Sequence, residues 1–225
     1  MYHYFKDAVY EQTGMEVVGY FEDQLQGALA SRHLGLITAA EIDDLDERMA
    51  ALSKAAGATI QLERVMAIAG SAPPLNYEMP EFTALTPADA LPAGLPRHPL
   101  RLAFAKDKAF CFYYEENLSF LKQLGVELVP FSPLTDRALP DNISGMYLGG
   151  GYPELFAGKL AENKDMLRSV KEAALDGIPL IAECGGFMYL QEQMDGLPMA
   201  GVIEGSCRMT KKLGPFGYVR LDSEQ

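Results

Sequence analysis

The chain has 225 residues, enough for one or two domains with a buried core. Its formal net charge of −12, from 19 Lys and Arg against 31 Asp and Glu, argues against nucleic acid or an anionic membrane as a partner. A hydrophobic content of 48% excludes a disordered chain. Three cysteines argue against a disulfide framework, so we expect a reducing, cytoplasmic compartment. No apolar run approaches the roughly 20 residues of a membrane span.

Proline marks the main division of the chain. Seven of its 14 prolines lie between Pro73 and Pro99. Because proline fixes φ and removes a hydrogen-bond donor, this stretch is expected to be an extended linker. The predicted organisation is therefore a segment 1–72, a linker 73–99 and a segment 100–225.

The first segment contains more helix than strand. Residues 2–13 are predicted to be a helix that ends at Gly14, and the apolar run 15–21 (MEVVGYF) is predicted to be a buried strand. Helical spacing of apolar residues predicts a further helix over 40–55, followed by one more short helix. One strand cannot form an open sheet, so we interpret this segment as the tail end of a larger α/β domain.

The second segment alternates strands with helices. Strands are predicted at 100–105, 126–129, 143–148 and 178–183, and helices at 115–124 and 159–175. The strand 178–183 has almost no polar residues, as expected when both faces are covered. This alternation predicts right-handed βαβ units, and hence an α/β fold with an open parallel sheet flanked by helices.

A buried strand runs directly into a cysteine in the segment 178–190 (IPLIAECGGFMYL). Cys184 is followed by Gly185, Gly186 and an apolar helix, which is the strand–turn–helix pattern of a nucleophile elbow. The glycines allow a sharp turn, and the helix N-terminus favours the reactive thiolate. The N–H of Gly185 would point at a developing oxyanion. The same pattern fits a cysteine buried at the end of a core strand, so both interpretations stay open.

Three glycines, Gly149–Gly151, follow the predicted strand 143–148 and precede Tyr-Pro-Glu. Ligands of open α/β sheets bind at the carboxyl ends of strands, so we expect this backbone to approach a ligand. A tight turn before the predicted helix 159–175 is the alternative interpretation, and the two are compatible. The pair Gly158 and Lys159 is not a phosphate-binding loop, because six residues separate it from Gly151 and no Ser or Thr follows the lysine.

Aromatic residues crowd the end of the first strand and the segment 105–118 (AKDKAFCFYYEENL); they are Phe104, Phe110, Phe112, Tyr113 and Tyr114. Such a loop lies at the same sheet edge as the glycines, where it either caps the core or contacts a flat ligand or a partner domain. Cys111 and Cys207 are expected to be packing residues. Arg32 and His33, in SRHLGLI, are interpreted by default as ordinary loop residues.

Taken together, these segments resemble the cobyrinic acid a,c-diamide synthase family. The resemblance rests on YLGGGYPELFA, IPLIAECGGFMYL and MTKKLGPFGYV, with AKDKAFCFYYEENL and SRHLGL upstream, in family order across the whole chain. It implies a dethiobiotin-synthetase-like, P-loop-type ATPase domain, of which 1–72 is the C-terminal part. It further implies that 100–225 is a class I glutamine amidotransferase domain with a flavodoxin-like sheet.

The resemblance implies a glutamine-hydrolysing carbon–nitrogen ligase of cobalamin biosynthesis. The expected reaction amidates the a- and c-carboxylates of cobyrinic acid with ammonia from glutamine, using ATP and Mg²⁺. The implied partners are therefore glutamine and a corrinoid, and a homodimer is allowed. Cys184 would form the γ-glutamyl thioester, with the N–H groups of Gly150, Gly151 and Gly185 around the oxyanion.

The resemblance also implies positions for four further residues. Tyr113 and Tyr114 would face the acceptor or the other domain. Arg32 and His33 would lie in the ATPase domain, near its nucleotide or substrate end.

The sequence departs from the family pattern at three places. Met188 stands four residues after Cys184, where many class I glutaminases have glutamine. The chain has no P-loop, so we expect no ATP, Mg²⁺ or other metal bound to it. No histidine follows His98, so the general base of the family is missing and the chain is interpreted as an internal fragment, inactive alone. The alternatives are an amidase for hydrogenobyrinic acid or nickel-sirohydrochlorin, and a non-catalytic amidotransferase-like binding module.

Overall fold

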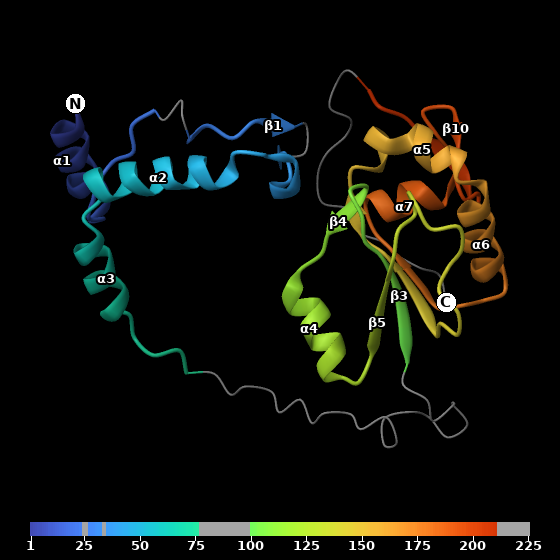
Figure 1. The fold of residues 1–225 in the computed structure, drawn as a ribbon. Coiled ribbons are helices and arrows are strands. Elements are labelled where there is room, and N and C mark those ends of the chain that lie inside the picture. Colours follow the sequence, from blue (N-terminus) through green and yellow to red (C-terminus); the bar gives the residue numbers. More distant parts are fainter. Residues whose placement is uncertain (24–26, 33–34, 77–99, 211–225) are drawn as a thin grey trace. The chain divides into compact units, whose positions relative to one another are not determined.

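The computed structural model describes residues 1–23, 27–32, 35–76 and 100–210 and divides into two compact units, Met1–Met79 and Pro80–Gln225 (Figure 1). The division falls within the stretch 73–99 that the sequence predicts to be a linker, most of which lies outside the described residues. Assignment of the units to an ATPase and an amidotransferase domain stays a prediction at this point. In the described parts of the chain, no helix is long and apolar enough to cross a membrane.

The first unit consists mainly of helices: α1 (Tyr2–Thr13), the 3₁₀ helix η2 (Ala39–Glu41), α2 (Leu45–Thr59) and α3 (Leu62–Gly70), with a short hairpin of β1 (Ser31–Arg32) and β2 (Gly35–Leu36). As predicted, α1 ends at Gly14, whose φ of 71° is the left-handed conformation that glycine adopts readily. The helix predicted over 40–55 is shifted. Thr38 and Glu41 cap η2 reciprocally, and α2 begins only at Leu45.

The strand predicted over 15–21 is wrong. Among the described residues this segment forms a single bridge, between Gly19 and Ile60. Ile60 lies in the short connection between α2 and α3, and the N–H of Gln61 donates to the carbonyl of Val18 at 2.8 Å. Apolar residues indicate burial, but a strand also needs an extended neighbour, and here the neighbours are helices.

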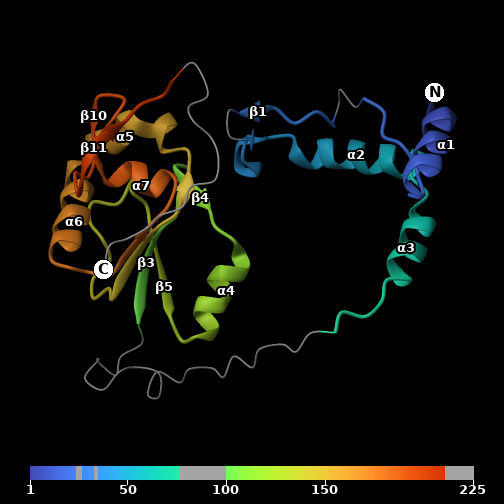
Figure 2. The same ribbon diagram turned by 180° about the vertical axis from the view of Figure 1, so that it is seen from behind.

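The second unit contains the predicted parallel sheet. Its strands are β3 (Arg101–Ala105), β5 (Glu127–Phe131), β6 (Gly145–Leu148) and β8 (Leu180–Ala182), in the spatial order β5-β3-β6-β8. All three pairings are parallel, which confirms the predicted α/β class. Figure 2 shows β3 and β5 side by side from the rear. The order reverses between β3 and β6, the switch point at which open α/β sheets place their ligands.

Helices flank this sheet. They are α4 (Glu115–Gln123), α5 (Ala157–Glu162), α6 (Lys164–Leu175) and α7 (Gly185–Leu190), and in Figure 1 α4 lies next to β5, apart from the other three. One face of the sheet forms the main core with α5, α6 and α7; the buried residues include Ala103, Met146, Leu148, Leu160 and Val170. The other face carries Phe104 and Tyr147, which are opposite one another in the register of β3 and β6.

Two details of this unit differ from the sequence prediction. The helix predicted over 159–175 is split at Asn163, whose side-chain amide donates to the carbonyls of Pro133 and Asp136, both at 2.8 Å. The strand predicted to be covered on both faces is the outer strand β8 of the described sheet. Its Ile181 side chain is 66% exposed, so the prediction of two covered faces is wrong for the described residues.

Smaller β elements surround α7. The strands β4 (Phe110–Phe112) and β7 (Gly150–Gly151) form an antiparallel ribbon, and β9 (Gln191–Met194), β10 (Leu197–Pro198) and β11 (Ile203–Cys207) form a second small sheet. The 3₁₀ helix η3 (Pro153–Phe156) links β7 to α5. The segment 211–219 at the end of the MTKKLGPFGYV motif lies outside the described residues.

Candidate functional site

Cys184 occupies the turn between β8 and α7, as the sequence predicts. It has φ 49° and ψ −113°, a conformation that a non-glycine residue rarely adopts and that costs on the order of 1–3 kcal/mol. Its side chain is solvent-exposed rather than buried at the end of the strand. The structure therefore has the geometry of a nucleophile elbow, with a strained and accessible thiol at the N-terminus of a helix.

The two glycines after Cys184 are required by close packing. A Cβ atom on Gly186 would lie 2.0 Å from the carbonyl oxygen of Leu148, and one on Gly185 would lie 2.8 Å from Cδ of Pro153. The N–H of Gly186 donates to the carbonyl oxygens of Gly149 at 3.0 Å and Glu183 at 2.9 Å. The elbow is thus attached to the end of β6 through backbone contacts.

The glycine turn lies directly beside the cysteine. A Cβ atom on Gly150 would lie 3.5 Å from Cβ of Cys184, and one on Gly185 would lie 3.3 Å from the amide nitrogen of Gly151. The structure therefore brings Gly150, Gly151 and Gly185 together around Cys184. The predicted role of these glycine N–H groups as an oxyanion hole stays a prediction.

The aromatic loop divides into inward and outward residues. Tyr113 is half-buried, while the neighbouring Tyr114 is 77% exposed. The Tyr113 hydroxyl donates to the carbonyl of Ala105 and accepts from the N–H of Gly149 at 2.9 Å. Burial raises the pKa of Tyr113 above its ordinary range, so the hydroxyl stays protonated and able to donate. Phe112 borders the glycine turn, 3.4 Å from the Cβ position of Gly150.

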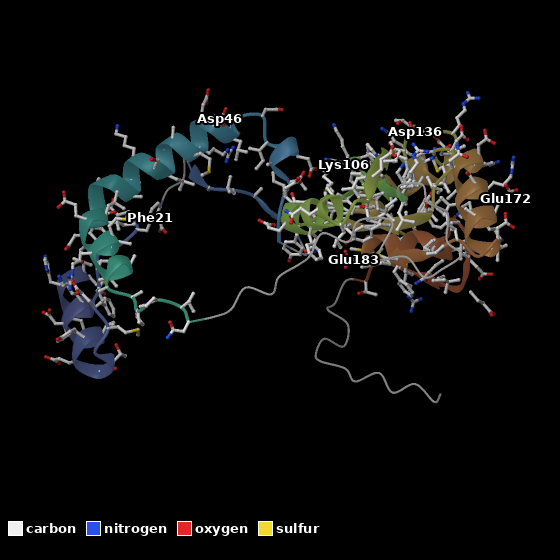
Figure 3. All side chains as sticks on the ribbon, turned by 90° about the horizontal axis from the view of Figure 1, so that it is seen from below. Phe21, Asp46, Lys106, Asp136, Glu172 and Glu183 are labelled. Atoms are coloured by element: carbon white, nitrogen blue, oxygen red, sulfur yellow. The ribbon has the colours of Figure 1, made fainter. Side chains whose placement is uncertain are left out.

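A second tyrosine contacts the residue before the nucleophile. The Tyr147 hydroxyl donates to Oε1 of Glu183, whose exposed side chain is labelled on the second unit in Figure 3. Partial desolvation, followed by this hydrogen bond to a carboxylate, raises the pKa of Tyr147 to about 12. The rings of Tyr113 and Tyr147 contact edge to face, 5.2 Å between centroids.

Sequence reasoning missed Asp107. Its Oδ1 accepts from the N–H groups of Ala109 at 2.8 Å and Phe110 at 3.1 Å, and its Oδ2 accepts from Oγ of Ser132 at 2.8 Å and the N–H of Leu134 at 3.0 Å. It therefore joins the loops that follow β3 and β5, beside the site. An aspartate two residues before a loop N–H is typical of an Asx turn, which would have indicated the first pair of bonds but not the second.

The remaining predicted residues lie elsewhere or outside the description. Arg32 is the last residue of β1 in the first unit, and His33 lies outside the described residues. Next to that hairpin is a cavity of about 360 Å³, lined by Leu29, Ala30, Ile37, Glu41, Ile42, Asp43, Asp44 and Arg48.

The other cysteines and Met188 fit packing roles. Cys111 and Cys207 are half-buried, and burial, followed by the nearby carboxylate of Asp195, raises the pKa of the Cys207 thiol. Met188, at the position where many class I glutaminases have glutamine, packs against the core. Among the residues that the structure describes, no three His, Cys, Asp or Glu side chains are grouped so as to hold a metal ion.

Comparison with known proteins identifies a family. Residues 101–221 match the family described as the CobB/CobQ-like glutamine amidotransferase domain. The chain is 38% identical, over 98% of its length, to the cobyrinate a,c-diamide synthase of Caldanaerobacter subterraneus subsp. tengcongensis, of which it covers 47%. It is also 42% identical over 97% of its length to the enzyme of that name from Streptococcus sanguinis, of which it covers 46%, and 39% identical over 98% to that of Clostridium tetani, of which it covers 48%.

The chain spans about half the length of the curated relatives that it matches. The matched family covers more than half of this chain, and it includes the sheet, the glycine turn and the Cys184 elbow. The chain therefore belongs to the family of CobB/CobQ-like glutamine amidotransferases.

Proposed function

We propose that this protein takes part in the ATP-dependent amidation of the a- and c-carboxylates of cobyrinic acid, with glutamine as the nitrogen donor. The observation that carries the proposal is the exposed, strained Cys184, surrounded by Gly150, Gly151 and Gly185 at the carboxyl edge of the sheet. The printed name of the relatives, cobyrinate a,c-diamide synthase, supports the choice of acceptor. The reducing, cytoplasmic compartment remains part of this proposal.

In the proposed reaction the thiolate of Cys184 attacks the side-chain carboxamide carbon of glutamine. The carbonyl oxygen gains negative charge, and the N–H groups of Gly185 and of the glycine turn stabilise it. The C–N bond then breaks, and the nitrogen takes up a proton and leaves as ammonia. Water hydrolyses the γ-glutamyl thioester by breaking the C–S bond, which releases glutamate and restores the thiol. No histidine follows Cys184 in the sequence, so the proton transfers are not assigned to a residue of this chain.

The described residues provide no site that fits ATP or Mg²⁺. The sequence contains no phosphate-binding loop, and the described residues contain no cluster of metal ligands. We therefore assign no step of carboxylate activation to this chain, and we place that step in the whole protein. Tyr114, exposed near the site, and Arg32 and His33 in the first unit remain candidates for contact with the acceptor or between domains.

The test uses the protein expressed from its full reading frame and glutamine labelled at the amide nitrogen. With ATP, Mg²⁺ and cobyrinic acid, mass spectrometry is expected to show two labelled amides on the corrinoid. Cys184→Ala should abolish transfer from glutamine while leaving amidation by free ammonia, because only the glutaminase step needs the thiol.

Parallel reactions with hydrogenobyrinic acid and nickel-sirohydrochlorin identify the acceptor. Amidation of one of these instead of cobyrinic acid would overturn the proposed substrate. If glutamine is not hydrolysed with any acceptor, the chain is a binding module that keeps the amidotransferase fold, and the proposed activity is wrong.

A further inference from the structure

The strained backbone of Cys184 needs a restraint from its surroundings. A residue held at φ 49° and ψ −113° relaxes unless neighbouring contacts fix the residues on both sides of it. The residue before it is Glu183, and the contact after it is made by Gly186. Both are held by groups that lie outside the elbow.

On the C-terminal side of Cys184, the backbone is held by hydrogen bonds through Gly149. The N–H of Gly186 donates to the carbonyl oxygen of Gly149 at 3.0 Å, and the N–H of Gly149 donates to the hydroxyl of Tyr113 at 2.9 Å. The same hydroxyl donates to the carbonyl of Ala105, the last residue of β3. Because Tyr113 uses its hydroxyl as donor and acceptor at once, it fixes Gly149 relative to the sheet.

On the N-terminal side of Cys184, Glu183 is held by a hydrogen bond from Tyr147. Its hydroxyl donates to the carboxylate of Glu183, and its ring stands edge to face against Tyr113. Tyr113 in turn stands edge to face against the buried ring of Phe104, at 5.6 Å between centroids. A Cβ atom on Gly149 would lie 2.6 Å from the ring of Tyr113, so only glycine allows the ring and the turn to approach this closely.

We propose that Tyr113 and Tyr147 form a positioning clamp, which holds Glu183 and Gly186 and thereby keeps Cys184 and the neighbouring glycine N–H groups in register for glutamine hydrolysis. This inference rests on the proposed function. It gives Tyr113 a role different from contact with the acceptor, because its hydroxyl is occupied on both sides by the backbone. Neither tyrosine touches the reacting atoms in this role; both act through the backbone around Cys184.

The experiment compares two reagents on Cys184 in the full chain. Diazo-oxo-norleucine, a glutamine analogue, needs the oxyanion geometry, whereas iodoacetamide needs only an accessible thiolate. Tyr113→Phe keeps the ring and removes both hydrogen bonds, and Tyr147→Phe removes the bond to Glu183. Tyr10→Phe, at an exposed position of α1, is the matched control.

In Tyr113→Phe we expect labelling by the analogue to slow about tenfold or more, while labelling by iodoacetamide changes less than about twofold, because small displacements cost most where reacting groups must be aligned. Tyr147→Phe should have the same selective effect, and Tyr10→Phe should have none. Amide hydrogen exchange at Gly149 and Gly186 should accelerate in Tyr113→Phe more than exchange at the other slowly exchanging amides of the second unit, which separates a local effect from a general loss of stability. If Tyr113→Phe does not fold, Tyr147→Phe decides the question, because its hydroxyl bonds only to an exposed carboxylate.

The outcomes separate this inference from the proposed function. If the unsubstituted protein labels preferentially with the analogue and both variants match it, with unchanged amide exchange, the clamp is wrong while the function stands. If the analogue shows no preference for Cys184 in the unsubstituted protein, the proposed function is wrong, and the clamp is then judged by amide exchange alone. In that case, unchanged amide exchange at Gly149 and Gly186 in Tyr113→Phe would overturn the clamp, and faster exchange would support the clamp.

Discussion

Gly186 packs directly against the backbone of Leu148, so closely that a Cβ atom on Gly186 would lie 2.0 Å from the Leu148 carbonyl oxygen. Backbone atoms cannot move aside as the end of a flexible side chain can. Because Gly186 has no side chain, the helix after Cys184 packs directly against the backbone at the end of β6. This contact connects the glycine turn, Cys184 and the core in one small region.

Gly186→Ala is expected to lower the free energy of unfolding by about 3 kcal/mol or more, since the methyl group overlaps backbone. The matched control is Gly158→Ala in α5, where a Cβ atom would meet nothing within 4 Å. This control should leave stability unchanged or raise it by about 0.5–1 kcal/mol, because alanine is the better helix former. Denaturant unfolding measures the free energy of unfolding of both variants. Equal changes in the two would contradict the close approach of Gly186 to Leu148.

Asp107 is expected to stabilise the loops around the site. Asp107→Ala removes the acceptor for four hydrogen bonds and should cost about 2–3 kcal/mol, because several partly buried donors lose their partner. Asp165→Ala, which removes a surface ion pair to Arg168 in α6, should change stability by less than about 0.5 kcal/mol. The same unfolding experiment compares them; a similar small loss in both would rule out Asp107 as the link between these loops.

We expect the protein to be less stable with Tyr189 than with phenylalanine at this position. Its side chain is fully buried in α7, and its hydroxyl has no hydrogen-bond partner among the described residues. Tyr189→Phe should therefore raise the free energy of unfolding by about 1 kcal/mol, since an unsatisfied buried hydroxyl carries a desolvation cost. A clear loss of stability in thermal unfolding would instead mean that the hydroxyl is bound, for example by an ordered water.

Tyr147 is expected to ionise late in an alkaline titration. Its pKa is raised to about 12 from the ordinary 10.0, by partial desolvation and then by Glu183. A raised pKa means that the folded state holds the proton more tightly. The stabilising contribution of the Tyr147–Glu183 contact is thus complete below pH 10.0 and is lost as the pH rises through about 12.

The ultraviolet absorbance of tyrosinate measures this ionisation, as the difference between the unsubstituted protein and Tyr147→Phe. Glu183→Gln should lower the pKa of Tyr147 towards the ordinary value, because the neighbouring negative charge is removed. Titration of Tyr147 near pH 10.0 in the unsubstituted protein would contradict the contact with Glu183.

Much of the second unit was predictable from the sequence, because its strands are short apolar runs separated by helices of regular spacing. The sequence of strand, Cys184 and two glycines also predicted the elbow, since only glycine allows the approach seen at Gly185 and Gly186. The antiparallel ribbon of β4 and β7 was missed. Its second strand consists of Gly150 and Gly151, which carry no side-chain alternation that could indicate a strand.

The wrong predictions share one physical cause, because in each case the local structure depends on residues that are distant in the sequence. The run 15–21 is apolar enough for a strand, but its neighbours are helices and it forms only the bridge from Gly19 to Ile60. The break at Asn163 depends on two carbonyls that lie about 30 residues earlier in the chain, so local periodicity could not reveal it. Likewise, the roles of the Tyr113 and Tyr147 hydroxyls depend on long-range contacts with Gly149 and Glu183.

The most direct measurement for the central claim is the site of labelling by a glutamine-analogue electrophile. The protein is treated with diazo-oxo-norleucine, digested and analysed by mass spectrometry of the three cysteine peptides. We predict that Cys184 is labelled in preference to the half-buried Cys111 and to Cys207, whose thiol pKa is raised by burial, and that excess glutamine protects it. Equal labelling of all three cysteines, or labelling of none, would contradict the proposal that Cys184 is the nucleophile of glutamine hydrolysis.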